Sequence, residues 1–122
     1  MKDRKLNVLV IDDHHDTVAM LRTWLAHQGH HAVGRTDLNE LERTLVDEQI
    51  DVLLLDLMFP VTDATGHIHQ IRLKFPKLKI VVMSGTADFK LTVKAIEAGA
   101  DSYITKPIEL DVLGRFLENV GA

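Results

Sequence analysis

The feature that most restricts the fold of this chain is a regular alternation of short apolar runs with segments of helical period. Short runs rich in Val, Ile and Leu predict strands. They cover residues 6–11, 51–55, 79–83 and 102–104, with a weaker candidate at 31–34. Three runs are almost continuously apolar, NVLVI, DVLLL and KIVVM, which is typical of strands covered on both faces in a parallel sheet.

Between these runs, apolar residues recur three or four positions apart, as on the buried face of a helix. Helices are predicted around five such sets: Val18, Leu21 and Leu25; Leu38, Leu41 and Leu45; Ile68, Ile71 and Phe75; Leu91, Ala95 and Ala98; and Leu110, Leu113, Leu117 and Val120. Asp37 is the expected N-cap of the second helix, and Gly29, Pro76 and Gly99 are the expected stop signals.

The resulting (βα)5 pattern predicts an α/β fold, a doubly wound three-layer sandwich around a five-stranded parallel sheet. Right-handed crossovers between parallel strands place helices on both sheet faces. At 122 residues, with no repeat or linker, the chain is expected to be a single domain spanning 1–122. Ligands of such sheets bind at the carboxyl ends of the strands.

Composition excludes several classes of protein. The chain is 46% hydrophobic and 26% charged, as in globular proteins. No apolar run approaches the roughly 20 residues of a membrane span, and the start MKDRKLNV does not resemble a signal peptide, so a cytoplasmic location without membrane contact is expected. Cysteine is absent, which excludes disulfides and thiolate metal sites. The net charge of -4, with no basic stripe, argues against direct nucleic-acid binding.

Five polar residues fall at the predicted carboxyl ends of strands, namely Asp12, Asp13, Asp56, Ser84 and Lys106. The predicted fold brings them into one cleft although they are spread over most of the sequence. Three neighbouring carboxylates repel one another and call for a cation, and a site built of oxygen ligands suits Mg2+. A carboxylate can also attack phosphorus to give an acyl phosphate, while a metal ion and a lysine neutralise the phosphoryl oxygens. The cluster therefore predicts phosphoryl transfer.

Four segments in order, VLVIDD, LLLDLMFP, VVMSG and AGADSYITKP, resemble the successive signatures of response regulator receiver domains and together cover almost the whole chain. The resemblance implies the flavodoxin-like strand order 2-1-3-4-5. It also implies a phosphoacceptor switch of a two-component system, with a histidine kinase or phosphotransfer protein as donor and a downstream protein or effector domain as target. Such a domain catalyses its own phosphorylation and dephosphorylation and is not otherwise an enzyme.

The resemblance also implies roles for single residues. Asp56 matches the phosphoacceptor, Asp13 a direct magnesium ligand, Asp12 a ligand through water, and Met58 a ligand through its carbonyl oxygen.

In the second half of the chain, Lys106 matches the lysine that pairs with phosphoryl oxygens, and the bond to Pro107 matches a family cis peptide. Ser84 matches the switch hydroxyl, Gly85 a residue that leaves the backbone approachable, and Tyr103 the switch aromatic. The surface expected to respond is formed by the fourth helix, fifth strand and fifth helix, and the two helices are the first place to expect a homodimer contact.

One segment departs from the family pattern. Ala64 stands where the family usually has glycine, and Gly66 follows two places later. Because Ala is strained at positive φ, we expect residues 63–67 to turn differently, as a mobile loop beside the metal site. Gly66 is expected to delay the start of the third helix.

Other polar residues receive simpler interpretations. The histidines 14, 15, 30, 31, 67 and 69 lack the spacing of a transition-metal site, although His14 and His15 lie beside the acidic cluster and give metal binding a modest pH sensitivity. Asp51, Asp63 and Asp101 are expected at strand entries and turns, and Trp24 in packing.

Three alternative functions remain open at this point. The altered loop favours a receiver-like interaction module that works without phosphorylation. A magnesium phosphatase with an aspartyl phosphate would place a second acid where this chain has Met58. A flavin-binding protein would need a phosphate loop after the first strand, which this chain lacks.

Overall fold

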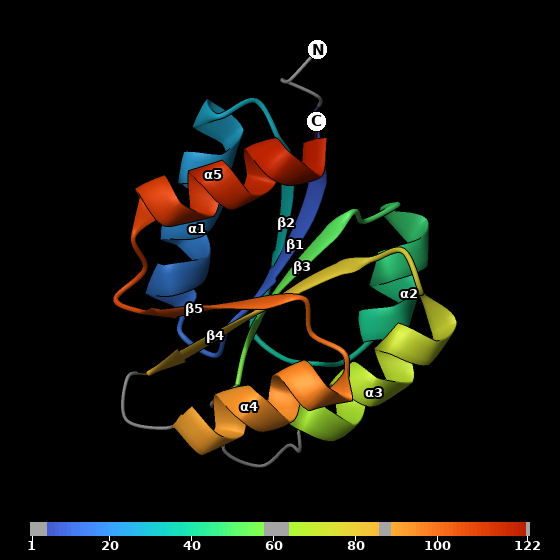
Figure 1. Cartoon of the computed structure of the whole chain (residues 1–122). Helices are drawn as coiled ribbons and strands as arrows, with labels where there is room; N and C mark the ends of the chain where they lie inside the picture. The colour runs from blue at the N-terminus through green and yellow to red at the C-terminus, as the bar shows by residue number, and fades with distance from the viewer. Residues whose placement is uncertain (1–4, 58–63, 86–88, 122) are drawn as a thin grey trace.

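A computed structural model gives the fold of the chain and describes residues 5–57, 64–85 and 89–121. Helices and strands alternate along the chain (Figure 1). The strands are β1 (Asn7–Ile11), β2 (His31–Arg35), β3 (Val52–Asp56), β4 (Lys79–Gly85) and β5 (Ser102–Lys106). The helices are α1 (His15–His27), α2 (Leu41–Asp47), α3 (Ala64–Lys74), α4 (Phe89–Ala98) and α5 (Leu110–Gly121).

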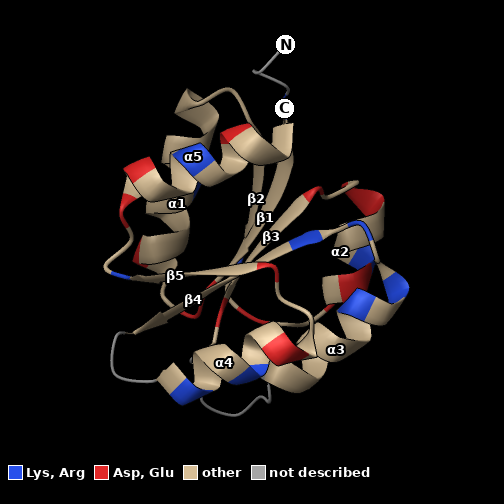
Figure 2. Cartoon of the chain, viewed as in Figure 1, with Lys and Arg blue, Asp and Glu red and all other residues tan. Residues whose placement is uncertain are grey.

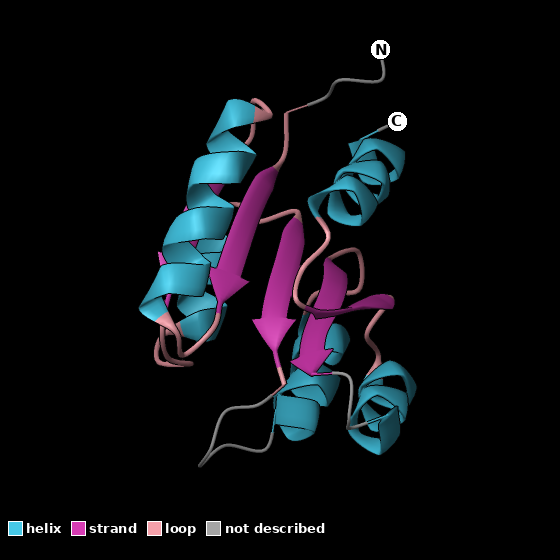
Figure 3. Ribbon diagram, turned by 90° about the vertical axis from the view of Figure 1, so that its left-hand side faces the viewer, coloured by secondary structure: helices cyan, strands magenta, loops and turns pink. Residues whose placement is uncertain are grey.

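The strands form one parallel sheet in the order β2-β1-β3-β4-β5. Helices lie on either side of it (Figure 3), with α1 and α5 on one face and α2, α3 and α4 on the other. Both the predicted sandwich and the strand order implied by the family resemblance are confirmed. Among the described residues, no helix combines the length and apolar character needed to cross a bilayer.

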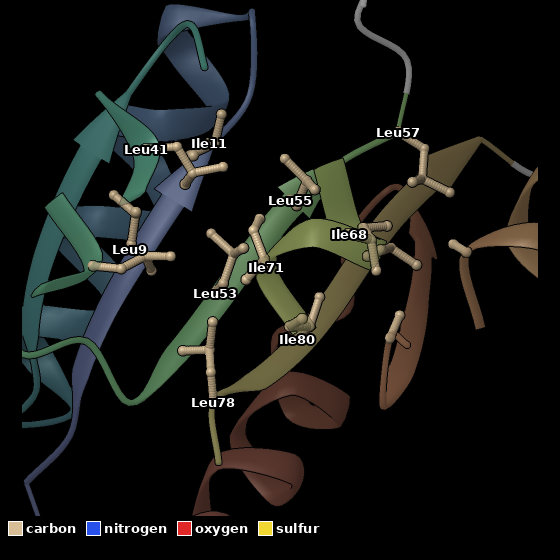
Figure 4. Packing of buried hydrophobic residues seen from close by; sticks show 14 residues of the cluster. Leu9, Ile11, Leu41, Leu53, Leu55, Leu57, Ile68, Ile71, Leu78 and Ile80 are labelled. Carbon is tan, nitrogen blue, oxygen red and sulfur yellow. The ribbon is translucent and has the colours of Figure 1, made fainter. Parts of the chain in front are cut away.

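The core has two halves because successive side chains of a strand point to opposite faces of the sheet. Leu9, Leu53 and Ile80 pack with α2, α3 and α4 in the cluster seen in Figure 4. Their neighbours Val8 and Val52 pack on the other face with α1 and α5. All five residues of β3 are buried, which explains why the central strands are continuously apolar in sequence.

The start of α2 differs from the prediction. The helix begins at Leu41, after Glu40 in a left-handed conformation with φ of 59°, so Asp37 is not its N-cap. The Asp37 carboxylate instead accepts a hydrogen bond of 3.0 Å from the Asn39 backbone N–H. A short acidic side chain that closes a local turn in this way competes with its use as a helix cap. Leu38 packs against the core from this turn instead of from the helix.

The start of α3 also differs from the prediction. The helix begins at Ala64, so Gly66 lies within its first turn and does not delay it. Alanine is the strongest helix former, and a glycine inside a helix costs only about 1 kcal/mol relative to it, which explains why the helix continues through Gly66. The part of the predicted altered loop before Ala64 lies outside the described residues.

The side chain of Arg72 ties three elements together. From α3 it donates hydrogen bonds to the Gly99 carbonyl at the end of α4, at 3.0 Å, and to the Leu78 carbonyl before β4, at 2.8 Å. It also pairs at 2.7 Å with Asp101, whose carboxylate accepts the Ile80 backbone N–H. Asp101 is therefore a structural turn residue, as predicted.

Asp51 has a similar structural role at the start of β3. It lies at a strand entry, as predicted, and its carboxylate accepts a hydrogen bond of 2.8 Å from the Asn7 backbone N–H, which links the entries of β3 and β1. Asp63 lies outside the described residues.

We expect Arg72→Ala to lower the free energy of unfolding by about 2–4 kcal/mol, because several carbonyl oxygens and one carboxylate lose a charged donor together. Urea denaturation measures the loss. Arg43→Ala is the control, since the Arg43 side chain is 71% exposed and pairs with Glu40 and Asp47 at the surface, where such ion pairs contribute little. Equal losses in the two variants would contradict this account of Arg72.

His30 is a neutral hydrogen-bond acceptor in the fold. Its Nδ1 atom accepts the Leu6 backbone N–H at 3.1 Å, which requires that this nitrogen carry no proton. Partial burial lowers the pKa of His30 below its ordinary value. The folded chain therefore binds this proton less readily than the unfolded chain.

The free energy of unfolding is expected to fall as the pH drops through about 6.5 toward the lowered pKa of His30, because the unfolded state takes up the proton first. His30→Asn should flatten this part of the pH profile, and His27→Asn, at an exposed position of α1, should leave it unchanged. Urea unfolding across this range measures the profile. The same slope in His30→Asn as in the parent would refute the assignment.

Candidate functional site

Two buried aspartates lie at the carboxyl ends of the central strands. Asp12 follows β1 and Asp56 ends β3, and the pairing of Ile11 with Leu55 brings these adjacent strands into register just before them. Both side chains have 0% exposure, whereas that of Asp13 is 31% exposed. Ligand atoms of these three aspartates and of His14 all lie within 4.8 Å of one another. The sequence correctly predicted that the three carboxylates meet.

Lys106 reaches the same cluster from the edge of the sheet. It ends β5, and its Nζ atom lies 2.7 Å from Asp12 Oδ2 and 3.5 Å from Asp56 Oδ2. The bond from Lys106 to Pro107 is cis, as the resemblance implied. The predicted meeting of Lys106 with the acidic cluster is confirmed.

Asp12 and Lys106 stabilise each other in their charged forms. Burial alone raises the pKa of Asp12, but hydrogen bonds from the Lys106 ammonium and the His14 backbone N–H outweigh it and hold that pKa below its usual value. Burial alone lowers the pKa of Lys106, but the hydrogen bond to Asp12 and the charges of Asp56 and Asp12 outweigh it and raise that pKa. Both groups are therefore ionised at neutral pH.

His14 adds a nitrogen donor at the rim of the cluster. Its side chain is 69% exposed, and Nδ1 lies 3.1 Å from both Asp12 Oδ1 and Asp13 Oδ1. Its backbone N–H donates to Asp12 Oδ1 at 3.0 Å. The other histidine considered beside the cluster, His15, opens α1 and is exposed, and no ion pair joins it to the described aspartates.

The switch residues implied by the resemblance lie on β4 and β5, the strands that follow β3 in the sheet. Ser84 is buried near the end of β4, and its hydroxyl forms a hydrogen bond of 3.0 Å with the Thr92 hydroxyl on α4. Tyr103 on β5 is 45% exposed. A side chain added to Gly85 would meet no atom within 4 Å, so the end of β4 is open.

The donor set fits a hard divalent cation. Among the described residues, the three carboxylates of the cluster face one ammonium group, that of Lys106, which leaves an excess of negative charge beside carboxylate oxygens. Oxygen ligands with excess negative charge are what Mg2+ prefers. Met58, whose carbonyl oxygen the resemblance implied as a further ligand, lies outside the described residues.

The fold and the acidic cluster together define a receiver-type signalling domain. The family model described as "Response regulator receiver domain" matches residues 8–118, and the chain belongs to this family. Receiver domains are the switches of two-component systems, and members bind Mg2+ at an acidic pocket like the aspartate cluster seen here.

Individual relatives place this chain among response regulators. The DNA-binding transcriptional regulator NtrC of Proteus hauseri is 30% identical over 108 residues, which are 88% of this chain and 23% of that protein. The transcriptional regulatory protein PrrA of Mycobacterium tuberculosis is 31% identical over 103 residues, 84% of this chain and 44% of that protein. The chain thus spans less than half the length of either relative.

Solved structures agree with the fold. The beryllofluoride-activated receiver domain dimer of NtrC4 matches with a TM-score of 0.84 and 27% identity, covering 98% of this chain and 96% of that one.

Sequence reasoning missed Thr92, the partner of Ser84. The predicted buried face of the fourth helix ran through Leu91, Ala95 and Ala98, which all contact the core, but it left out Thr92, which is buried on α4 together with Ala95. Their spacing of three residues was available in the sequence. From the sequence there was no chemical reason to place Thr92 on the buried side of the helix, because the hydrogen-bond partner of its hydroxyl, Ser84, comes from another element.

Mg2+ is expected to raise the thermal unfolding midpoint, because an ion that binds only the folded state stabilises it by about 2.7 kcal/mol at a hundred times its dissociation constant. Asp13→Asn should remove most of this gain, since it deletes one carboxylate of the cluster. Asp16→Asn, which removes an exposed acid in the first turn of α1, should keep it. Thermal scans with Mg2+ and with a chelator measure the effect, and an equal gain in all three proteins would argue against the site.

Proposed function

We propose that this domain takes a phosphoryl group onto Asp56 from a histidine kinase or phosphotransfer protein, in the cytoplasm, with Mg2+ as cofactor. The observation that supports this most directly is the position of the Asp56 carboxylate. It is fully buried at the end of β3, lies within the acidic cluster, and is 3.5 Å from the Lys106 ammonium.

The proposed reaction follows from the chemistry of these groups. An Asp56 oxygen attacks the phosphorus of a phosphohistidine, the P–N bond breaks, and its electron pair returns to the imidazole nitrogen. The product is an acyl phosphate, which water later hydrolyses to restore the carboxylate. Bound Mg2+ supplies positive charge to the phosphoryl oxygens, and Asp12, Asp13 and the Met58 carbonyl are the groups proposed to hold it.

Lys106 is proposed to carry the second positive charge. In the structure its ammonium hydrogen-bonds to Asp12 at 2.7 Å and faces Asp56. Because the transferred group spreads negative charge over its oxygens, the ammonium can pair with one of them beside Asp56. The chain on this account catalyses only its own phosphorylation and dephosphorylation.

The proposed output surface is the α4–β5–α5 face, formed by α4, β5 and α5. Phe89, Val93 and Ile96 are exposed at spacings of four and three residues, which places them along one side of α4, and Tyr103 is exposed on β5. Ser84 is proposed to turn toward the phosphoryl group and Tyr103 to repack, which changes this face for a downstream protein or effector domain.

A second copy of the domain is another occupant of the α4–β5–α5 face, since the NtrC4 receiver domain is described as a dimer. Direct nucleic-acid or membrane binding is not part of the proposal. Figure 2 shows Lys and Arg interspersed with Asp and Glu over the helices, whereas a nucleic-acid site usually gathers basic residues on one side.

Incubation with acetyl phosphate tests the proposal directly. Intact mass spectrometry is expected to show one added phosphoryl group on the parent protein with Mg2+, and none with a chelator. Asp56→Asn should show no adduct, because the amide is not a nucleophile for phosphorus. Asp51→Asn is the matched control, since Asp51 is a structural aspartate at the opposite end of β3.

An adduct that persists in Asp56→Asn would place the acceptor elsewhere. No adduct on the parent, together with no binding of beryllofluoride, would favour an interaction module that works without phosphorylation.

A further inference from the structure

The Ser84 hydroxyl is held by a partner from outside the acidic cluster. It forms a hydrogen bond with the Thr92 hydroxyl, at 3.0 Å. Ser84 is 1% exposed and Thr92 is 4% exposed, so water does not compete strongly for either group. A hydrogen bond between buried hydroxyls is expensive to break unless another partner replaces it.

The bond joins the sheet to α4. Val82 on β4 faces α2, α3 and α4. Because side chains two residues apart in a strand point to the same face of the sheet, Ser84 faces these helices too. Thr92 lies in α4 on the buried side that it shares with Ala95. The hydroxyl pair therefore connects the strand that carries the proposed switch residue to the helix that carries the proposed output surface.

We propose that Thr92 is a positioning residue that holds the Ser84 hydroxyl against α4 and so opposes its turn toward a phosphoryl group on Asp56. This inference rests on the proposed function of Asp56 and Ser84. A serine side chain occupies one staggered rotamer at a time, so its oxygen cannot be placed both beside Thr92 and in a different rotamer aimed at the acceptor site. The bond to Thr92 stabilises the resting rotamer.

The same bond gives the phosphoryl site a mechanical connection to α4. When Ser84 turns away, α4 loses a hydrogen bond to β4 at Thr92, which is next in sequence to the exposed Val93. The helix can then shift on the sheet, and the α4–β5–α5 face changes with it. Thr92 thus sets both how readily the switch responds and which helix moves.

A stability cycle tests the bond without any phosphoryl group. The urea midpoint is measured for Ser84→Ala, Thr92→Val and the double variant. If the two hydroxyls are coupled, the loss in the double variant is smaller than the sum of the two single losses. Additive losses would overturn the proposal, whether or not Asp56 accepts a phosphoryl group.

Beryllofluoride binding in the presence of Mg2+ tests the consequence for the switch. Thr92→Val keeps the shape of the side chain and removes the hydroxyl, so it should bind beryllofluoride roughly five-fold more tightly than the parent, as one neutral buried hydrogen bond no longer opposes the turn. Thr92→Ser restores a hydroxyl and should return the affinity toward that of the parent.

Thr44→Val is the matched control for a buried threonine. Thr44 is 6% exposed, and its hydroxyl donates to the Glu40 carbonyl at 2.9 Å in α2, on a helix with no part in the proposed switch. The Thr44→Val variant should be less stable than the parent but should bind beryllofluoride with the same affinity. An unchanged or weaker affinity in Thr92→Val, or an equal gain in Thr44→Val, would overturn the role of Thr92. Failure of the parent itself to bind would instead count against the proposed function, and the stability cycle would then decide the coupling.

Discussion

The burial of Asp12 and Asp56 side by side is the constraint on which the rest of this molecule depends. Removing a carboxylate from water is costly, and a second one beside it adds repulsion. The Lys106 ammonium offsets this at 2.7 Å from Asp12 and 3.5 Å from Asp56. Among the described residues, this one ammonium group does not balance the three carboxylates of the cluster, and the remaining negative charge suits a divalent cation. The same imbalance fits the proposed binding of Mg2+, and it is the positive charge of such an ion, together with Lys106, that an anionic phosphoryl group would need.

The sheet makes this arrangement possible. Strands β1, β3 and β4 are covered on both faces, so their side chains form two apolar layers, and the polar groups are left for the ends of the strands. The parallel direction of all five strands collects those ends at one edge. Arg72 fixes the opposite side of the fold, where α3, the end of α4 and the start of β4 meet.

Much of this could be predicted from the sequence. Continuous apolar runs and helical periods gave the α/β sandwich, and polar residues at the strand ends gave the meeting of Asp12, Asp13, Asp56 and Lys106. The starts of α2 and α3 were predicted wrongly. A short acidic side chain such as Asp37 can close a local turn or cap a helix, and a glycine such as Gly66 can lie within the first turn of a helix or precede it, and the sequence does not decide between these. The bond between Ser84 and Thr92 could not be predicted, since it depends on the rotation of α4 about its axis, and a short helix with apolar residues on more than one side does not specify this.

Lys106 lies 94 residues after Asp12, with which it forms its shortest hydrogen bond. During synthesis, the ribosome therefore releases β1, β3 and β4 before any part of the chain can supply this ammonium. Until β5 docks, the nascent sheet carries carboxylates that repel one another at the carboxyl ends of β1 and β3, and the contact that offsets this repulsion joins residues far apart in the sequence. The residue that offsets part of the charge of the site thus becomes available only after four of the five strands have been synthesised.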